Sequence, residues 1–345
     1  MPAPTRSRPL KKEYLPSAFR SIKPVLFSET ARPSTLAPSI RHIAWSPLGS
    51  CLASTSGATI RIWNPEKPTV KASQELRGHV GAVERVAWRP GREAELASTG
   101  VDGTVRLWDV RVGAAGQGKS TCVAEVKAGQ HGLFLTWSPD GTEVVVGTRD
   151  DVIVPIDVRM GAAVGSVPEA LEAREGKKLQ TAQTNQLAFS NSGREVFATT
   201  GDGLVKVLDW PSMEHLHTLN AHTSAANCVA HSPNGNYLAT GGSDSLIALW
   251  DTHDWVCRHT LARSTSAIHH LSFSFDGTYL ASGCGSEKDG QSGIEIAHVE
   301  TGEYVHTIET TNAPTIVAWH PLRYWLAYAG DAGGLRTIGV GNNAL

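Results

Sequence analysis

Hydrophobic and polar positions alternate in short runs along most of this chain, and turn residues separate the runs. The stretch from Arg77 to Arg111 shows the pattern most completely. Its three apolar runs have strand length and β-branched or aromatic content, and they lie at 82–88, 95–99 and 104–108. Gly91 and Asp102-Gly103 stand between them as turn signals. Three antiparallel strands on tight turns cannot bury both faces alone, so the unit is expected to stack on copies of itself.

The unit recurs from Ser39 onward, and each copy carries an aromatic residue or a histidine followed by a turn. These markers are Trp45, Trp88, Trp137, Phe189, His231, Phe273 and Trp319. Subtraction gives spacings of 43, 49, 52, 42, 42 and 46 residues between them. A period of about 40–45 residues with Gly-His and Trp-Asp marks is typical of WD40 repeats, each of which forms a four-stranded propeller blade.

Small residues keep a fixed register with these markers. The residue before each marker is Ala44, Ala87, Thr136, Ala188, Ala230, Ser272 or Ala318. Eight residues after each marker, or nine in the second copy, a second column follows: Ala53, Ala97, Val145, Phe197, Ala239, Ala281 and Ala327. Innermost propeller strands converge on the axis and need small side chains there. The predicted fold is therefore all-β, a seven-bladed WD40 propeller over residues 39–345.

The seventh repeat is short, because the chain ends soon after its third strand at about 335–338. A missing outer strand would expose unpaired backbone groups, so we expect the segment Ile22–Ser28 to close the ring. An open or capped seventh blade is the alternative. The rest of residues 1–38 is basic and contains repeated prolines, and it is expected to form a mostly disordered tail.

Composition adds limits on the class of protein. Hydrophobic residues make up 41%, charged residues 19%, and the formal net charge is -2, as in a soluble globular protein. No apolar run approaches about 18 residues, so no membrane contact is expected, and the N-terminus does not resemble a signal peptide. The five cysteines lack C-x-x-C spacing and are interpreted as reduced thiols of an intracellular protein; they are Cys51, Cys122, Cys228, Cys257 and Cys284.

Two sets of polar residues have the composition of a catalytic triad with an aromatic neighbour. They are His79, Ser98, Asp102 and Trp108, and, at corresponding offsets, His222, Thr240, Asp244 and Trp250. A catalytic triad does not recur in two repeats of one protein, whereas a structural device does. We therefore interpret both sets as hydrogen-bond relays that give each buried polar group a partner, and we predict no catalytic residue.

Two further motifs suggest nucleotide binding and metal binding, but the strand pattern around them argues against both functions. Residues 113–120 match G-x-x-x-x-G-K-S, but a strand follows where a phosphate-binding loop needs a helix; an ATPase that uses Lys119 is kept as the enzyme alternative. Histidines gather at His215, His217 and His222, and at His269 and His270. Because adjacent strand residues point to opposite faces and His222 belongs to a relay, no metal or cofactor is predicted.

A ring of mostly polar residues is expected where a partner would bind. These residues lie four positions before each marker, at the start of the innermost strand: Arg41, Glu84, Leu133, Asn185, Asn227, His269 and Thr315. In a propeller this position lies on the rim of the central channel. The candidate partner-binding rim is therefore Arg41, Glu84, Asn185, Asn227 and His269; a solvated rim with binding on the blade edges is the alternative.

Several stretches go beyond a generic repeat, and the order of intact and degenerate blades is their common feature. They are 137–157, in which the third strand lacks its Trp, and 239–251, 271–277, 294–297 and 317–321. This order resembles the family of third subunits of the THO complex, part of the mRNA-export machinery. The resemblance implies a nuclear, non-enzymatic subunit that docks on the large helical THO subunits. It would link transcription to messenger-ribonucleoprotein assembly, with a DEAD-box helicase and an RNA-binding export adaptor as indirect partners.

Two other interactions stay open. Trp108–Arg111 and Ile156–Arg159 fall at corresponding places in consecutive blades and resemble the docking boxes of substrate receptors for cullin-4 ubiquitin ligases. That receptor class is the alternative function. The basic tail could also contact RNA weakly through phosphate charge, but its few aromatic residues do not indicate a stacking platform.

Overall fold

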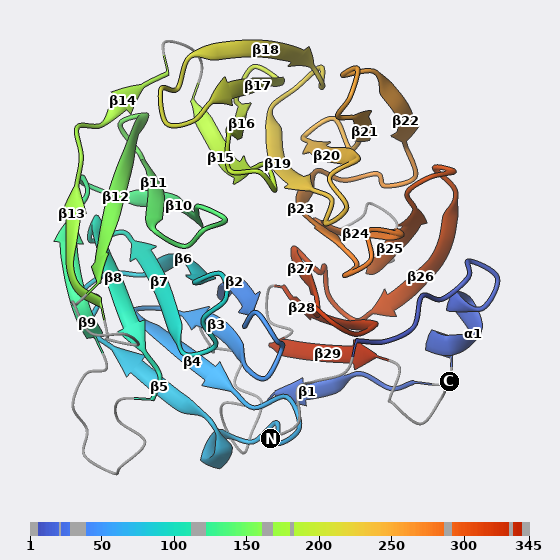
Figure 1. Cartoon of the computed structure of the whole chain (residues 1–345). Helices are drawn as coiled ribbons and strands as arrows, with labels where there is room; N and C mark the ends of the chain where they lie inside the picture. The colour runs from blue at the N-terminus through green and yellow to red at the C-terminus, as the bar shows by residue number, and fades with distance from the viewer. Residues whose placement is uncertain are drawn as a thin grey trace.

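Seven small antiparallel sheets are arranged radially around a central axis (Figure 1), so the all-β, seven-bladed prediction is confirmed. The computed structural model describes residues 6–20, 22–27, 39–111, 122–160, 168–179, 183–285, 292–330 and 334–339. The strands nearest the axis are β2 (Ile40–Trp45), β6 (Val83–Trp88), β10 (Gly132–Trp137), β15 (Thr184–Phe189), β19 (Ala226–His231), β23 (Ile268–Phe273) and β27 (Ile316–Trp319).

Each blade continues outward by simple antiparallel pairing of consecutive strands. The second strands are β3 (Leu52–Ser56), β7 (Glu95–Gly100), β11 (Glu143–Thr148), β16 (Glu195–Thr200), β20 (Tyr237–Gly242), β24 (Tyr279–Cys284) and β28 (Trp325–Ala329). The third strands are β4 (Thr59–Trp63), β8 (Thr104–Asp109), β12 (Val152–Met160), β17 (Leu204–Asp209), β21 (Ile247–Asp251), β25 (Ser292–His298) and β29 (Leu335–Gly339).

The outermost strands complete the blades. They are β5 (Gln74–Arg77), β9 (Cys122–Lys127), β13 (Pro168–Ala173), β18 (His215–Asn220), β22 (Cys257–Leu261), β26 (Tyr304–Thr310) and, in the seventh blade, β1 (Val25–Phe27). In the third blade β14 (Lys177–Lys178) also pairs with β12, and a single 3-10 turn, η1 (Val70–Ala72), precedes β5.

The two columns of small residues meet as direct partners in every blade. The pairs are Ala44↔Ala53, Ala87↔Ala97, Thr136↔Val145, Ala188↔Phe197, Ala230↔Ala239, Ser272↔Ala281 and Ala318↔Ala327. The small side chains at most of these pairs leave room for the neighbouring blade to pack closely near the axis, whereas Phe197 of the fourth blade itself packs against Val229 of the fifth. The apolar core accordingly consists of clusters shared by adjacent blades, such as Ala53 and Ile60 of the first blade with Val86 of the second.

Three of the four tryptophan markers join neighbouring blades with hydrogen bonds as well as apolar surface, whereas the buried Nε1 of Trp319 has no hydrogen-bond partner among the described residues. The indole Nε1 of Trp88 donates to the carbonyl oxygen of Ala44 in the preceding blade, and that of Trp137 donates to Ala87, both at 3.0 Å. Trp45 makes the same bond to Ala318 at 3.0 Å, across the junction of the first and last blades. Satisfying the indole N–H lowers the cost of burying a large aromatic ring at these three junctions.

The seventh blade takes its outer strand from the other end of the chain. Val25–Phe27 pairs with Leu335–Thr337 of β29, so this blade contains strands from both ends of the propeller. Phe27 is buried and packs edge-on against Trp63 of the first blade, with ring centroids 5.5 Å apart. The strand therefore covers the edge of β29 and also contacts the next blade.

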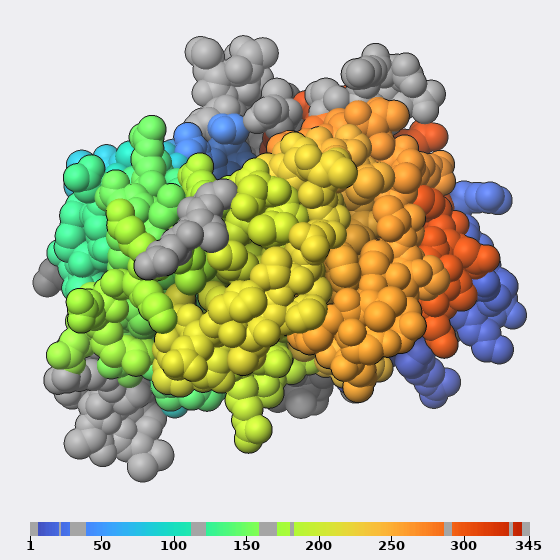
Figure 2. Space-filling model, turned by 90° about the horizontal axis from the view of Figure 1, so that it is seen from above, coloured from blue at the N-terminus to red at the C-terminus, as the bar shows by residue number. Residues whose placement is uncertain are grey.

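Residues 6–20, before β1, pack on the outside of the propeller. Leu10, Leu15 and Phe19 are buried against the sixth and seventh blades, with Leu15 and Phe19 on a short helix, α1 (Leu15–Arg20). The Leu10 N–H donates to the Tyr324 hydroxyl at 3.0 Å, and its carbonyl accepts from the Tyr279 hydroxyl at 2.7 Å. These apolar and hydrogen-bonded contacts fix a strap on the outside of the disc, seen in blue beside the C-terminal strands in Figure 2.

Candidate functional site

The triad-like residues of the second blade meet in one hydrogen-bonded chain. His79 Nδ1 lies 2.9 Å from Asp102 Oδ2, and His79 Nε2 lies 2.7 Å from Ser98 Oγ, which also accepts from Trp108 Nε1 at 2.8 Å. The chain joins the loop before β6, the turn after β7, and strands β7 and β8. Ser98 is 0% exposed, so its hydroxyl is not accessible to a substrate.

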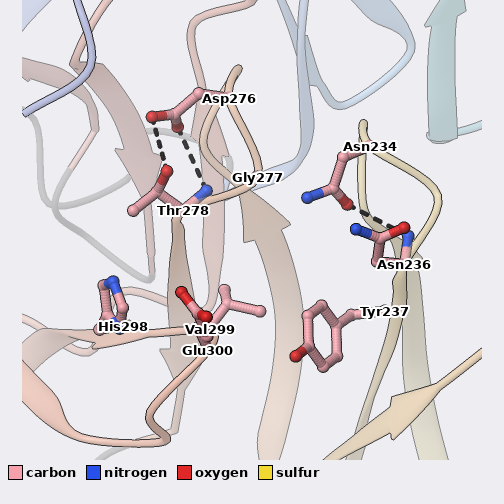
Figure 3. A pocket seen from close by; sticks show the side chains of 9 residues that line it. All are labelled: Asn234, Asn236, Tyr237, Asp276, Gly277, Thr278, His298, Val299 and Glu300. Carbon is pink, nitrogen blue, oxygen red and sulfur yellow. Dashed lines mark hydrogen bonds between the residues drawn. The ribbon is translucent and has the colours of Figure 1, made fainter.

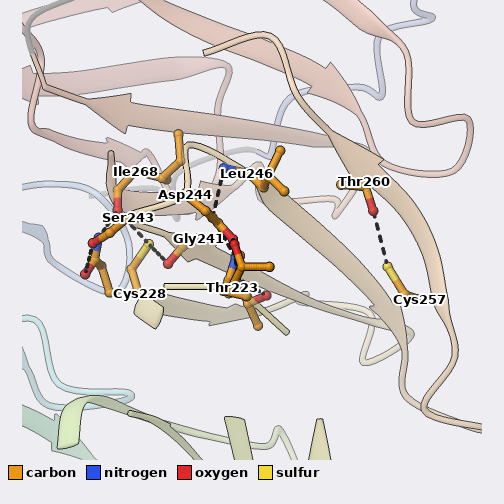
Figure 4. Close-up of polar contacts among 12 residues, drawn as sticks. Thr223, Cys228, Gly241, Ser243, Asp244, Leu246, Cys257, Thr260 and Ile268 are labelled. Carbon is orange, nitrogen blue, oxygen red and sulfur yellow. Dashed lines mark hydrogen bonds and ion pairs between the residues drawn. The ribbon is translucent and has the colours of Figure 1, made fainter. Parts of the chain in front are cut away.

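The fifth blade repeats the arrangement. His222 Nδ1 lies 3.0 Å from Asp244 Oδ1, and His222 Nε2 lies 3.0 Å from Thr240 Oγ1, to which Trp250 Nε1 donates at 3.3 Å. Figure 4 shows Asp244 at the turn, where it also accepts from the backbone N–H groups of Thr223 and Leu246. Two blades with the same geometry support a role in holding loops to strands.

Electrostatics keeps these relays in one protonation state. Burial lowers the pKa of His79 and of His222, which favours neutral imidazoles. Burial acts to raise the pKa of Asp102, but hydrogen bonds from the backbone N–H groups of Thr104 and Val80, together with His79, hold it at about 2. A neutral imidazole between a carboxylate and a hydroxyl satisfies every partner, which is the condition for burying such a chain.

The expected rim residues lie at irregular places in the innermost strands. In the second to sixth blades a register shift leaves Glu84, Leu133, Asn185, Asn227 and His269 without a ladder partner. A β-bulge of this kind redirects the side chain of the extra residue. The side chains of these residues therefore do not follow simple strand alternation.

Four of the five candidate rim residues make contacts between neighbouring blades. Glu84 pairs with Arg41 of the first blade, and its Oε1 lies 3.6 Å from His131 Nε2 of the third. Asn185 Nδ2 donates to the carbonyl oxygen of Ala226 at 2.8 Å.

Asn227 repeats this contact one blade further on. Its Nδ2 donates to the carbonyl oxygen of Ile268 at 3.0 Å, and it also contacts Ser243. Arg41 and His269 are the exposed members of the predicted rim. Most of the polar rim side chains thus bind the neighbouring blade. The sequence analysis had assigned these side chains to the binding of a partner.

Sequence reasoning missed the residues immediately after the rim positions. In blade order they are His42, Arg85, Phe134, Gln186, Cys228, His270 and Ile316. The imidazoles of His42 and His270, from the first and sixth blades, approach with ring centroids 5.8 Å apart. Arg85 from the second blade acts electrostatically on both imidazoles and on Cys228 of the fifth. An arginine in a column of otherwise neutral or apolar residues was the available sequence signal.

A pocket of about 270 Å³ lies between the turns of the fifth and sixth blades (Figure 3). Asn234, Asn236 and Tyr237 line it from one blade, and Asp276, Thr278 and Glu300 from the next. Asp276 already accepts from Thr278 and from the Tyr324 hydroxyl, both at 2.7 Å. The pocket is polar, and its principal carboxylate is occupied by internal contacts.

The Gly-rich stretch, the two W-D-x-R-like motifs and the histidine group are only partly covered by the described residues. The Gly-rich stretch at 113–120 and most of the 286–292 insertion lie outside the described residues, as does the side chain of Arg159. Arg111 pairs with Asp109 at 2.5 Å while remaining 61% exposed. His217 stacks on Trp255, and His215 Nε2 lies 2.6 Å from the Thr218 hydroxyl.

The described part of the chain contains neither a disulfide nor a cluster of metal ligands. All five cysteines are free thiols. Within the described ranges no group of three or more His, Cys, Asp or Glu side chains is placed to hold a metal ion. No helix among the described residues is long and apolar enough to cross a membrane, and the α-helix found there, α1, has 6 residues.

Comparison with known proteins places this geometry in a family. The WD domain, G-beta repeat model matches residues 33–64, 70–109 and 213–251, and the model of the anaphase-promoting complex subunit 4 WD40 domain matches 258–321. Among solved structures, the β-propeller domain of Myceliophteria thermophila Cps50 (Swd1) aligns with a TM-score of 0.72 at 18% identity. It covers 93% of this chain and 100% of that one, which shows the shared fold.

Two curated relatives are similar in sequence. WD repeat-containing protein AAC3 of Dictyostelium discoideum is 30% identical over 53% of this chain and 40% of its own length. THO complex subunit 3 of Arabidopsis thaliana is 36% identical over 295 residues, which cover 85% of this chain and 86% of that protein. The chain therefore belongs to the WD40-repeat propeller family of THO complex subunit 3.

Proposed function

We propose that this protein is a non-enzymatic scaffold subunit of a THO-type complex in the nucleus, where it couples transcription to messenger-ribonucleoprotein assembly and mRNA export. The observation that carries the proposal is the 36% identity with THO complex subunit 3 along 85% of the chain. A match of that extent includes the degenerate third blade as well as the regular repeats. The triad-like residues support a scaffold, because buried Ser98 donates and accepts within the protein.

The direct partners in this proposal are the large helical subunits of the complex. A DEAD-box helicase and an RNA-binding export adaptor would associate through those subunits. RNA would be contacted indirectly, or weakly through the basic residues near the N-terminus. The surface proposed to meet the partner comprises the rim and the axial end of the propeller. The contacts of Glu84, Asn185 and Asn227 join successive blades along this surface.

Affinity purification tests this function. The tagged full-length protein, isolated from nuclear extract, should retain large THO-type subunits after stringent washing, as identified by mass spectrometry. Arg111→Ala serves as the matched variant: its guanidinium is exposed and paired with Asp109, and its loss should leave the purified set unchanged. Purification of a cullin-4 adaptor that Arg111→Ala abolishes, without THO-type subunits, would establish the receptor alternative instead.

A further inference from the structure

A cationic site lies on the axis of the propeller. Arg85 follows the bulged residue Glu84 of β6, and its ladder partner is Thr99. Its charge lowers the pKa of His42 in the first blade and of His270 in the sixth, and interacts with Cys228 in the fifth. The N–H of Val86, the next residue, lies 3.5 Å from His42 Nδ1, and the His42 and His270 rings lie 5.8 Å apart, so Arg85 stands beside this histidine pair at the innermost strands.

Burial lowers the pKa of Arg85, and the charge of the adjacent Glu84 carboxylate raises it. Glu84, the adjacent carboxylate, is shared between Arg41 and His131. Burial raises the pKa of the Cys228 thiol to about 12, so this group is neutral. Within the described residues, no hydrogen bond or ion pair is found for the Arg85 guanidinium, which leaves its five N–H donors available to a ligand.

The flanking histidines supply donors without further charge. Burial lowers the pKa of both imidazoles, that of His270 to about 4, so both are neutral at pH 7. The backbone N–H of Val86 donates to His42 Nδ1 in a long bond of 3.5 Å, which assigns the imidazole proton to Nε2. The cluster thus combines one fixed positive charge with a neutral N–H donor.

We propose that this axial cluster is an anion site that binds a single carboxylate, supplied by an acidic residue of a partner subunit that enters the channel. The inference rests on the scaffold function proposed above and specifies its point of attachment. A planar guanidinium forms paired, charge-assisted hydrogen bonds with a carboxylate. The rim contacts that join successive blades hold the entrance in place around it.

Charge and surroundings favour a carboxylate over a nucleic acid. One guanidinium beside neutral imidazoles balances one negative charge, whereas RNA binding is driven by several cations along a backbone. The site therefore fits an acidic side chain better than a phosphate chain.

Nuclear magnetic resonance of arginine-labelled full-length protein tests the site directly. The probe is the capped peptide acetyl-Gly-Glu-Gly-amide, with the isosteric acetyl-Gly-Gln-Gly-amide as its neutral control. The Glu peptide should shift the Arg85 Nε–H resonance at concentrations up to about 20 mM, the range expected for one charge-assisted pair. The Gln peptide should not. Arg85→Met should lose the response, whereas exposed Arg92→Met should retain it.

Other outcomes overturn the assignment. The carboxylate site is wrong if the resonance does not move, or if inorganic phosphate or an oligouridylate moves it at lower concentration than the Glu peptide. Arg85→Lys distinguishes charge from geometry: it should fold with an unchanged melting temperature and bind the peptide more weakly, and equal binding would contradict bidentate recognition.

Purification separates this inference from the proposed function. Arg85→Met should reduce recovery of the large subunits about tenfold relative to the wild-type protein, as expected for loss of a charged hydrogen bond. Equal recovery from both proteins would refute the axial site and leave the scaffold function intact. Recovery of no THO-type subunit by the wild-type protein would refute the scaffold function, and the resonance titration would still decide whether the axial site exists.

Discussion

The relay of the second blade shows how one side chain can fix three segments of backbone. Asp102 accepts from the N–H groups of Val80 and Thr104 and contacts His79, so its carboxylate holds the loop before β6 against the turn before β8. It is only 11% exposed, and its charge is well solvated by these donors. Such a carboxylate stabilises the folded protein only in its ionised form.

Asp102→Asn should destabilise the protein in a pH-dependent way. The folded pKa of about 2 lies below the unfolded value of about 4, so ionised Asp102 favours folding above pH 4, and this stabilisation is lost as the pH falls toward 2. At pH 7 the variant should lose about 2 kcal/mol in the free energy of unfolding. Urea denaturation between pH 7 and pH 3 measures this quantity.

Asp150→Asn provides the control, because Asp150 is an exposed residue in the corresponding turn of the third blade. That variant should track the wild-type protein within about 0.5 kcal/mol at every pH. The difference between Asp102→Asn and the wild type should narrow as the pH approaches 3. A constant difference across the range would show that Asp102 acts by packing and not by its charge.

Among the elements, β1 has only three residues but contacts both the seventh and the first blade. It covers the edge of β29, and it places Phe27 in a cluster with Ile43 and Leu52 of the first blade. Phe27 is 2% exposed, whereas its neighbour Leu26, on the other face of the same strand, is 46% exposed. The two residues thus separate the effect of core packing from the effect of strand pairing.

Phe27→Ala should lower the free energy of unfolding by about 3 kcal/mol, because it removes a buried aromatic ring between two blades. Leu26→Ala keeps the same backbone pairing and should change it by about 0.5 kcal/mol or less. Chemical denaturation of both variants measures the difference. Similar losses for the two would mean that Phe27 adds nothing beyond the strand.

The elements also show what sequence can specify. The seven strand sets were predictable because small residues and aromatic markers recur in a fixed register, and this periodicity reports on packing directly. The strap was not predictable in that way: Leu10, Leu15 and Phe19 occur singly among prolines and basic residues, and their burial depends on pockets formed by the sixth and seventh blades. The β-bulges were not predictable either: the position four residues before each marker directed attention to Glu84, and the register shift that leaves Glu84 without a ladder partner is visible only in the structure.

At the scale of the whole molecule, the described residues give no blade an apolar core of its own. The apolar clusters are shared between neighbours, as when Phe273 and Leu280 of the sixth blade pack with Leu249 of the fifth. Trp45 carries the same type of junction across the point where the ring closes. The stability of each blade therefore depends on both neighbours, and the seventh depends in addition on a strand from the start of the propeller.

Two truncated variants should separate ring closure from the strap. A variant lacking residues 1–21 keeps β1 but loses the buried Leu10, Leu15 and Phe19, so its melting temperature should fall while its oligomeric state is unchanged. A variant lacking residues 1–38 also exposes the edge of β29, and an unpaired edge strand promotes association with other chains. Differential scanning calorimetry and size-exclusion chromatography with light scattering measure the two effects. The longer truncation should melt at a lower temperature than the shorter one and form additional oligomers; identical behaviour of the two variants would show that β1 is dispensable for closing the ring.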